Sequence, residues 1–202
     1  MTADLIRQMQ VVHRLKDSAG GGMSDTLQQR LQQTGLFIDT CQRQLSVGLQ
    51  APEGMTEDPA ASVFQGGAAY TLLLQTMTGL NSSVQGETNV QGQFRRQWKH
   101  WQTEADAGVA RLISPIMRAL LEDSRLIRAR YLQGIGGHSY GSLVRKLIDA
   151  PSDARIVFVG CGELALSMLD LFSDWQTGLW NRHNIVRQPA YAGRIFAPDE
   201  LA

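Results

Sequence analysis

An apolar segment followed directly by a glycine-rich turn constrains the fold of this chain more than any other feature. Residues 156–159 are all apolar, and residues 160–165 read Gly-Cys-Gly-Glu-Leu-Ala at the start of a helical pattern. In a G-x-G-x-x-A turn the first glycine permits the tight bend, the second lets the backbone approach a pyrophosphate, and the small last residue lets the helix pack on the strand. The first N–H groups of the helix favour phosphate. The pattern predicts a buried strand, a turn and a helix that bind a nucleotide.

The end of the next strand indicates which nucleotide this would be. We expect a helix over residues 164–172, a second strand at 178–180 and a third at 194–196. An NAD site usually has Asp or Glu at the end of the second strand, whereas this chain has Asn181 and Arg182. Arginine there suits a 2′-phosphate and favours NADPH, although Arg182 as a solvated charge on a turn is the alternative. The predicted cofactor-binding residues are Gly160, Gly162, Glu163, Leu164, Ala165, Asn181 and Arg182.

The preceding 150 residues are mostly helical in pattern. A helical face is expected over residues 1–16, although Val11 and Val12 also fit a strand end. Ser24 is a predicted N-cap of a helix that ends at Gly35, and short strands follow at 36–38 and 45–47. Asp58 and Pro59 fit a helix start, and helical spacing covers 72–77, 91–105 and 109–131, with a last helix after Ser139. The predicted fold class is α/β: a mostly helical α+β catalytic-type domain (1–150) followed by a truncated Rossmann-type βαβ unit (151–202).

The composition indicates in which cellular environment the chain works and which kinds of partner it can attract. The 202 residues carry 19 basic and 19 acidic side chains, so no overall field attracts nucleic acid or membrane. Two cysteines far apart do not form a disulfide framework and fit a reducing cytoplasm. We expect no signal peptide, no membrane span and no metal site, because the four histidines show no ligand spacing with the cysteines.

Two further segments resemble the glutamyl-tRNA reductases. That family carries T-C-N-R-T-E, where this chain has Thr40-Cys41-Gln42-Arg43-Gln44-Leu45. It also carries G-L-D-S-x-V-x-G-E-P-Q-I-L-G-Q, which matches residues 79–93, Gly-Leu-Asn-Ser-Ser-Val-Gln-Gly-Glu-Thr-Asn-Val-Gln-Gly-Gln. The resemblance covers roughly residues 36–202 and includes the glycine turn. It is the basis for expecting a catalytic-type domain in front of the nucleotide unit.

The resemblance implies a specific reaction. Cys41 would attack the ester of glutamyl-tRNA to give a thioester, and NADPH would reduce the thioester to glutamate 1-semialdehyde, a tetrapyrrole precursor. Thioester formation eases this reduction, because a thiolate is a strong nucleophile and a thioester accepts hydride more readily than an oxygen ester. Arg43 could bind the substrate carboxylate or favour the thiolate. The implied catalytic residues are Cys41, Arg43 and Thr40, and the implied substrate-binding residues are Ser82, Glu87 and Gln93. Partners would be glutamyl-tRNA and a downstream tetrapyrrole enzyme.

The chain also departs from the family. Leu72 stands where the family has an active-site histidine, Leu45 stands for glutamate, and Thr88-Asn89 stand for Pro-Gln. Residues 11–16 are a weak match to the family's G-x-N-H-x-x-A strand, and the family's long dimerisation helix has no counterpart. These departures leave open a second function, that of a non-catalytic relative that binds tRNA, a nucleotide or a reductase in a regulatory role.

Residues 95–101, Arg-Arg-Gln-Trp-Lys-His-Trp, mix basic and aromatic side chains. Such a pattern can bind RNA by charge and stacking. The alternative, which the sequence favours, is a helix with one solvated basic face and tryptophans that pack inward. A cluster of basic residues further along the chain would extend an RNA-facing patch or pair with nearby carboxylates: Arg125, Arg128, Arg130, Arg145 and Lys146.

Overall fold

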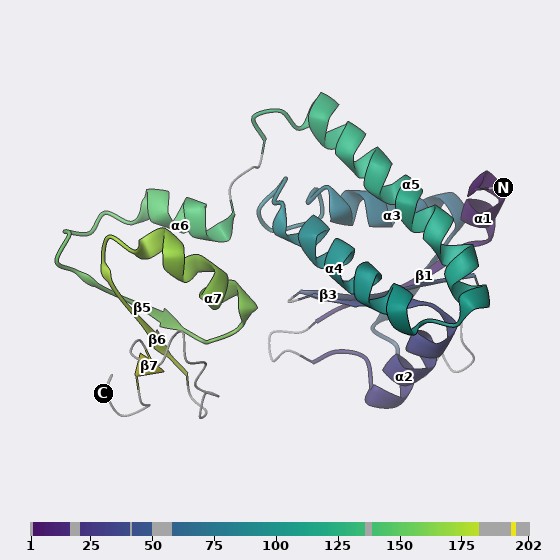
Figure 1. Cartoon of the computed structure of the whole chain (residues 1–202), viewed down its shortest axis with the longest axis horizontal. Coiled ribbons are helices and arrows are strands. Elements are labelled where there is room, and N and C mark those ends of the chain that lie inside the picture. The colour runs from purple at the N-terminus through teal and green to yellow at the C-terminus, as the bar shows by residue number, and fades with distance from the viewer. Residues whose placement is uncertain are drawn as a thin grey trace. The chain divides into compact units, whose positions relative to one another are not determined.

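A computed structural model describes residues 2–16, 21–40, 42–49, 58–135, 139–181 and 195–196. The chain divides into two compact units, Met1–Gly137 and His138–Ala202. The elements of the first unit are α1 (Thr2–Gln8), β1 (Gln10–Leu15), α2 (Asp25–Thr34), β2 (Leu36–Asp39), β3 (Arg43–Gly48), β4 (Ala61–Gln65), α3 (Gly66–Met77), α4 (Asn89–Glu104) and α5 (Ala107–Tyr131) (Figure 1). The elements of the second are α6 (Tyr140–Leu147), β5 (Arg155–Val159), α7 (Glu163–Met168), the 3-10 helix η2 (Leu169–Phe172), β6 (Gln176–Trp180) and β7 (Ile195–Phe196).

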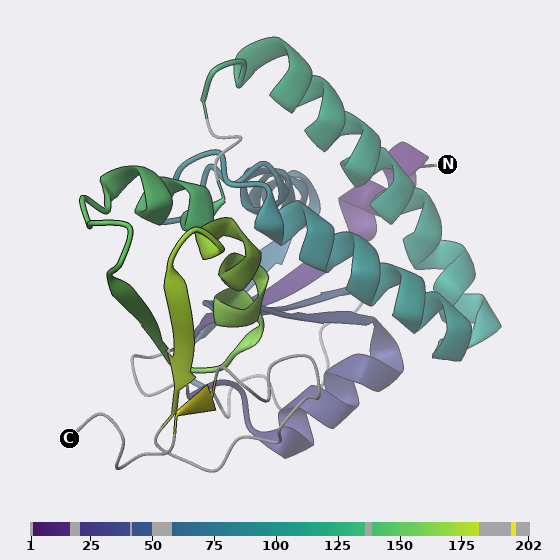
Figure 2. The same cartoon turned by 60° about the vertical axis from the view of Figure 1, so that its left-hand side comes forward.

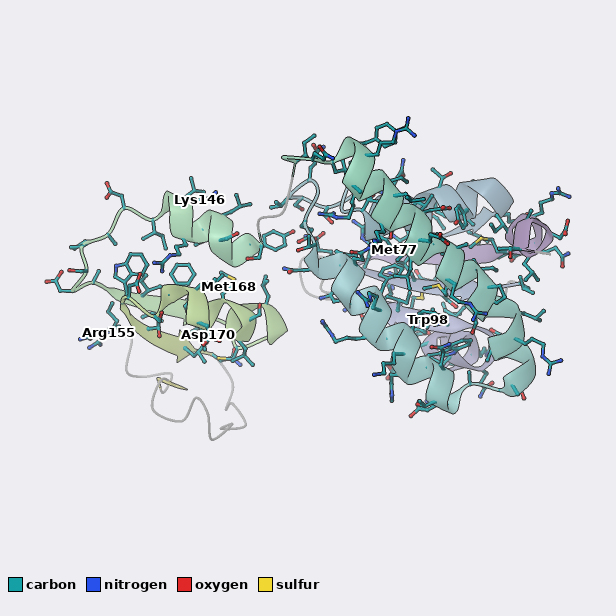
Figure 3. All side chains as sticks on the ribbon, turned by 45° about the horizontal axis from the view of Figure 1, so that its top comes forward. Met77, Trp98, Lys146, Arg155, Met168 and Asp170 are labelled. Carbon is teal, nitrogen blue, oxygen red and sulfur yellow. The ribbon has the colours of Figure 1, made fainter. Side chains whose placement is uncertain are left out.

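The first unit is built on a four-stranded antiparallel sheet with the order β2-β3-β1-β4. Helices α3, α4 and α5 cover one face, where Val11, Leu45 and Ile38 belong to the main core. Met77 and Trp98, which are labelled in Figure 3, also contribute to this core. Helix α2 covers the other face, where Leu27 and Leu31 pack on Val12 and Met23. Helices therefore cover both faces of the sheet, although the edge strand β4 stays largely exposed.

Two of these strands differ from the sequence-based expectation. Residues 10–15 form the central strand β1 and are not part of a helix that starts at the N-terminus. Asp58 and Pro59 begin a turn, in which Asp58 Oδ1 accepts a hydrogen bond from Ala60 N–H and Asp58 O accepts one from Ala61 N–H. The chain then enters β4, and the helix starts only at Gly66. The prediction of a helix that starts at Asp58 was wrong, because residues 61–65 pair with β1 and therefore adopt an extended conformation.

The two serine caps predicted from the sequence are confirmed, and an aspartate caps a third helix. Ser24 accepts a hydrogen bond from Leu27 N–H at the start of α2, which ends at Gly35 as expected. Ser139 accepts one from Ser142 N–H at the start of α6. Asp106 caps α5 by accepting from Gly108 and Val109 N–H. These side chains satisfy N–H groups that have no partner within the helix.

The second unit is a parallel three-stranded sheet with the order β5-β6-β7 and with α7 and η2 between β5 and β6. Phe172 is fully buried and meets Phe158 edge to face, with ring centroids 5.3 Å apart. Helix α6 contacts α7 and η2 and so lies in this unit, which places the structural division before the boundary expected at residue 150. Strand β5 was predicted to be buried but is only partly so: Val159 is 75% exposed, because β5 is the edge strand among the described residues.

Candidate active site and nucleotide-binding turn

Hydrogen bonds between Thr40 and Arg43, the first and last residues of the turn between β2 and β3, close this turn. Thr40 Oγ1 donates a hydrogen bond to Arg43 O at 2.8 Å and accepts one from Arg43 N–H at 3.0 Å. Thr40 N–H also donates to Arg43 O at 2.9 Å. Both residues are buried. Cys41, the predicted nucleophile, belongs to this turn in sequence but lies outside the described residues.

A loop between α3 and α4, residues 78–88, is shaped by two glycines. Gly79 and Gly86 have φ of 77° and 76°, a region that favours glycine. Gly86 N–H donates to Gly79 O at 3.0 Å, which closes the loop. A Cβ atom on Gly79 would lie 2.6 Å from Glu87 O, so no larger residue fits there without movement of the backbone. We call residues 78–88 the glycine loop.

Arg128 of α5 binds the glycine loop through its main chain. Its Nη1 donates to Thr78 O at 2.8 Å and to Glu87 O at 3.3 Å, and its Nη2 donates to Gly86 O at 3.0 Å. One guanidinium group thus joins both ends of the loop to α5. The planar fork of arginine suits such a multiple contact better than a single ammonium would.

The β2–β3 turn and the glycine loop contact each other, although 38 residues separate Arg43 from Asn81. Arg43 Nη2 donates to Asn81 O at 2.6 Å, and Gln42 Nε2 donates to Ser83 Oγ at 3.3 Å. The structure therefore brings together the two segments that carry the family resemblance.

The predicted substrate-binding residues lie in or next to the glycine loop. Ser82 is buried at its tip. Glu87 is only 3% exposed, and its Oε2 has no hydrogen-bond partner among the described residues. Gln93, in the second turn of α4, has a buried Oε1 that likewise lacks a partner among them. Because buried polar atoms are nearly always hydrogen-bonded, these oxygens mark positions where a ligand or water would donate.

His13 is a candidate site residue that the sequence indicated only weakly. It lies on β1 opposite Leu45, while Arg43 lies opposite Leu15, so His13 and Arg43 share one face of the sheet. Burial, with the charge of Arg43 as the second cause, lowers the pKa of His13 below its ordinary value. Its Nε2 is buried and has no partner among the described residues. A neutral imidazole beside the turn can accept a proton. The signal in the sequence was the histidine of the weak G-x-N-H match.

A cavity of about 650 Å³ lies between α2 and α4 and contains none of the predicted site residues. Asp39, next to Thr40, forms part of its wall, and Phe37 and Trp101 also line it. Gln97 of α4 binds the main chain of Asp39 by donating to its O and accepting from its N–H, each at 2.7 Å. These bonds attach α4 to the edge of the sheet, so the cavity borders the β2–β3 turn without including it.

The glycine turn of the second unit has the predicted backbone. Gly160 has φ of 104°, and a Cβ on Gly160 or Gly162 would meet no atom within 4 Å. Gly160 N–H donates to Trp180 O at 2.7 Å, which joins the ends of β5 and β6. Helix α7 begins at Glu163, with Leu164 exposed and Ala165 half-buried. The open space above the two glycines fits the close approach of a phosphate that this motif requires.

Other predicted features of the second unit are only partly described. Asn181 follows β6 directly, whereas Arg182 lies outside the described residues. Burial raises the pKa of the Cys161 thiol, which keeps it protonated and poorly nucleophilic. Among the described residues, no group of three or more His, Cys, Asp or Glu side chains is placed to hold a metal ion. No helix in the same ranges is long and apolar enough to cross a bilayer.

Comparison with known proteins gives a small set of relatives. No family model matches the chain. It is 28% identical over 148 residues to glutamyl-tRNA reductase of Aeropyrum pernix, and 31% identical over 105 residues to glutamyl-tRNA reductase 2 of Anaeromyxobacter sp. (strain Fw109-5). The matches cover 66% and 50% of this chain but only 35% and 24% of those relatives. The glutamyl-tRNA reductase structure from Methanopyrus kandleri aligns over 88% of this chain and 50% of its own, with 16% identity and a TM-score of 0.49.

The fold defines a protein of mixed helix and sheet, with an antiparallel unit followed by a parallel βαβ unit. The two sequence relatives support a divergent relationship between this chain and the glutamyl-tRNA reductases, over only part of the length of either.

Proposed function

We propose that this chain carries out NADPH-dependent reduction of glutamyl-tRNA to glutamate 1-semialdehyde, through a thioester on Cys41. The observation that carries the proposal is the contact between the β2–β3 turn and the glycine loop, made by Arg43 and Asn81. This contact joins the segment of the implied nucleophile to the segment of Ser82 and Glu87. The names of the two sequence relatives support the same reaction.

In the first step, the Cys41 thiolate would attack the carbonyl carbon of the ester between glutamate and tRNA. The new C–S bond replaces the C–O bond, and the ribose oxygen leaves with a proton. Arg43 is two residues from Cys41, and its buried positive charge favours the thiolate over the thiol. His13, whose pKa is lowered and which shares a sheet face with Arg43, is the candidate that we propose to accept the thiol proton.

The second step would use the second unit. When bound, NADPH supplies the two electrons that reduce the thioester carbon, and the aldehyde leaves as the cysteine thiol is restored. Gly160 and Gly162 would let the backbone approach the pyrophosphate, because the space above both is open. Asn181 and Arg182 would hold the ribose end that carries the 2′-phosphate.

A non-catalytic, regulatory relative is the second candidate, and one observation favours it. Leu72, where the family has a histidine, packs against the main core with its side chain partly buried. An aliphatic side chain there can neither donate nor accept a proton. Leu45, which stands for glutamate, is fully buried in the same core.

Intact-mass spectrometry after single-turnover mixing with glutamyl-tRNA, in the absence of NADPH, separates the two functions. A glutamyl adduct that forms on the wild type and on Cys161→Ser, but not on Cys41→Ser, is the result expected for the reductase. Cys161→Ser is the matched control, since its thiol has a raised pKa. No adduct on folded wild-type protein would refute the acyl-enzyme step and favour the regulatory relative.

A further inference from the structure

Positive charge is concentrated on two helices of a chain that has no net charge. Helices α4 and α5 carry eight Arg and Lys residues and three Asp and Glu residues, a net charge of +5. The rest of the chain therefore carries a net charge of −5. Such segregation creates a local field for polyanions that the overall composition does not reveal.

Two hydrogen bonds fix how these helices lie against each other. Gln91 Nε2 donates to Ser124 Oγ at 3.0 Å, and Gln102 Nε2 donates to Ser114 Oγ at 3.4 Å. The early part of α4 thus lies beside the late part of α5, and the two helices run antiparallel (Figures 1 and 2).

Arg95 and Lys99 lie on the same face of α4 as Gln91 and Gln102, because positions four and seven residues apart share a helix face. They therefore line the side of α4 that faces α5. Both are exposed. They occupy the stretch between the two hydrogen bonds that join the helices.

Arg111, Arg118 and Arg125 recur every seven residues along α5, in the row that contains Ser114. This row spans roughly 21 Å at 1.5 Å per residue. All three are exposed, and no ion pair within 4 Å involves them among the described residues, although Glu122 is one turn away. We call Arg95, Lys99, Arg111, Arg118 and Arg125 the cationic seam.

The aromatic residues of the same segment do not contribute to the seam. Trp98 and Trp101 pack against the main core, and Trp101 Nε1 donates to Gly35 O at 3.1 Å. This confirms the inward packing of the tryptophans that the sequence favoured, so neither tryptophan offers its ring to a base at the surface. A surface that offers charge without stacking binds a phosphate backbone with little regard to base sequence.

We propose that the cationic seam binds the phosphate backbone of the tRNA that carries the substrate. The choice of RNA among polyanions rests on the proposed function, while the presence of a polyanion site rests on the geometry of the seam. Its cations lie on two joined helices of the unit that contains the β2–β3 turn, and none of them forms an ion pair within 4 Å in the described part of the chain. The seam would bind the body of the tRNA independently of the ester chemistry.

The test is binding of fluorescently labelled, uncharged tRNA to the full chain, measured by anisotropy at several salt concentrations. The variants are Arg95→Gln with Lys99→Gln, and Arg118→Gln with Arg125→Gln. The matched control is Arg7→Gln with Arg30→Gln, which removes two exposed cations from the same unit outside the seam. Each seam variant should weaken binding about ten- to hundredfold at 50 mM salt and reduce the slope of log K against log salt by about 1.5–2. The control should change neither.

Three results would overturn the inference: seam variants that bind like wild type, a control that loses as much affinity, or competition by polyglutamate or phosphatidylserine vesicles equal to that by tRNA.

Failure of the proposed function would give a different set of results. If seam variants lose tRNA but wild type forms no Cys41 adduct, the reductase proposal fails and the seam stands. If the adduct forms with an unchanged dependence on tRNA concentration in the seam variants, the seam fails and the reductase stands.

Discussion

Replacing Arg128 by methionine is expected to loosen the glycine loop selectively. The substitution keeps the length and apolar stem of the side chain but removes donors to Thr78 O, Gly86 O and Glu87 O, at 2.8, 3.0 and 3.3 Å. A hydrogen bond from a charged donor contributes about 1.5–3 kcal/mol when first removed. Since the three bonds share one half-buried side chain, we expect the free energy of unfolding to fall by about 2–3 kcal/mol in total. For a unit of this size that corresponds to a fall in Tm of about 7–10 °C.

Hydrogen exchange read by mass spectrometry is the assay, because it locates the loss. Peptides that cover the glycine loop should exchange faster in Arg128→Met, including the amide of Gly86 that donates to Gly79 O. Peptides from β5 and β6 should not change, since they belong to the other unit. Arg130→Met is the matched control, because Arg130 is exposed on the same helix and its guanidinium lies over the ring of Tyr131, 5.4 Å from the centroid. Equal exchange of the loop in both variants would refute the role given to Arg128.

Two other predictions concern the same site. His13→Gln should flatten the pH dependence of stability. Because the pKa of His13 is lowered in the folded state, the imidazole binds a proton more readily in the unfolded chain. The wild type is therefore fully stabilised above about pH 6.5 and loses stability as the pH falls toward the folded-state pKa. Urea unfolding at pH 7.5 and 5.5 checks this, and equal losses in both proteins would contradict it. Gly79→Ala should cost about 1–3 kcal/mol, because φ is 77° and the new Cβ meets Glu87 O. Thermal unfolding measures the change, and a variant as stable as wild type would show that the loop has another conformation.

The sequence predicted the helices better than the strands, for physical reasons visible at β1 and β4. Val11 and Val12 are both buried, because α3–α5 cover one face of the sheet and α2 the other. A strand covered on both faces loses the alternation of polar and apolar residues that marks strands in a sequence. Strand β4 is short and largely exposed, and it is extended because it pairs with β1, a contact that local sequence does not encode. By contrast, Ser24 and Ser139 cap helices through residues three positions away, and the glycine turn depends on its own backbone angles, so local sequence reveals them.

The sequence offered candidate site residues but not their arrangement. The family resemblance singled out Thr40, Arg43, Ser82 and Glu87, yet nothing in the sequence states that the β2–β3 turn touches the glycine loop. That contact depends on Arg43 reaching the carbonyl of Asn81. The sequence did not indicate that Arg128 binds the glycine loop, because a bond from a side chain to a distant carbonyl leaves no local pattern.

Arg128 and Arg43 bind the glycine loop by main-chain oxygens, which every amino acid possesses. The path of the loop is therefore insulated from the identity of most of its side chains, apart from the glycines at the bends. Thr88 and Asn89 stand where the family has proline and glutamine, at the point where the loop gives way to α4. Such an anchorage lets substitutions change the side chains that the loop presents while its backbone stays in position.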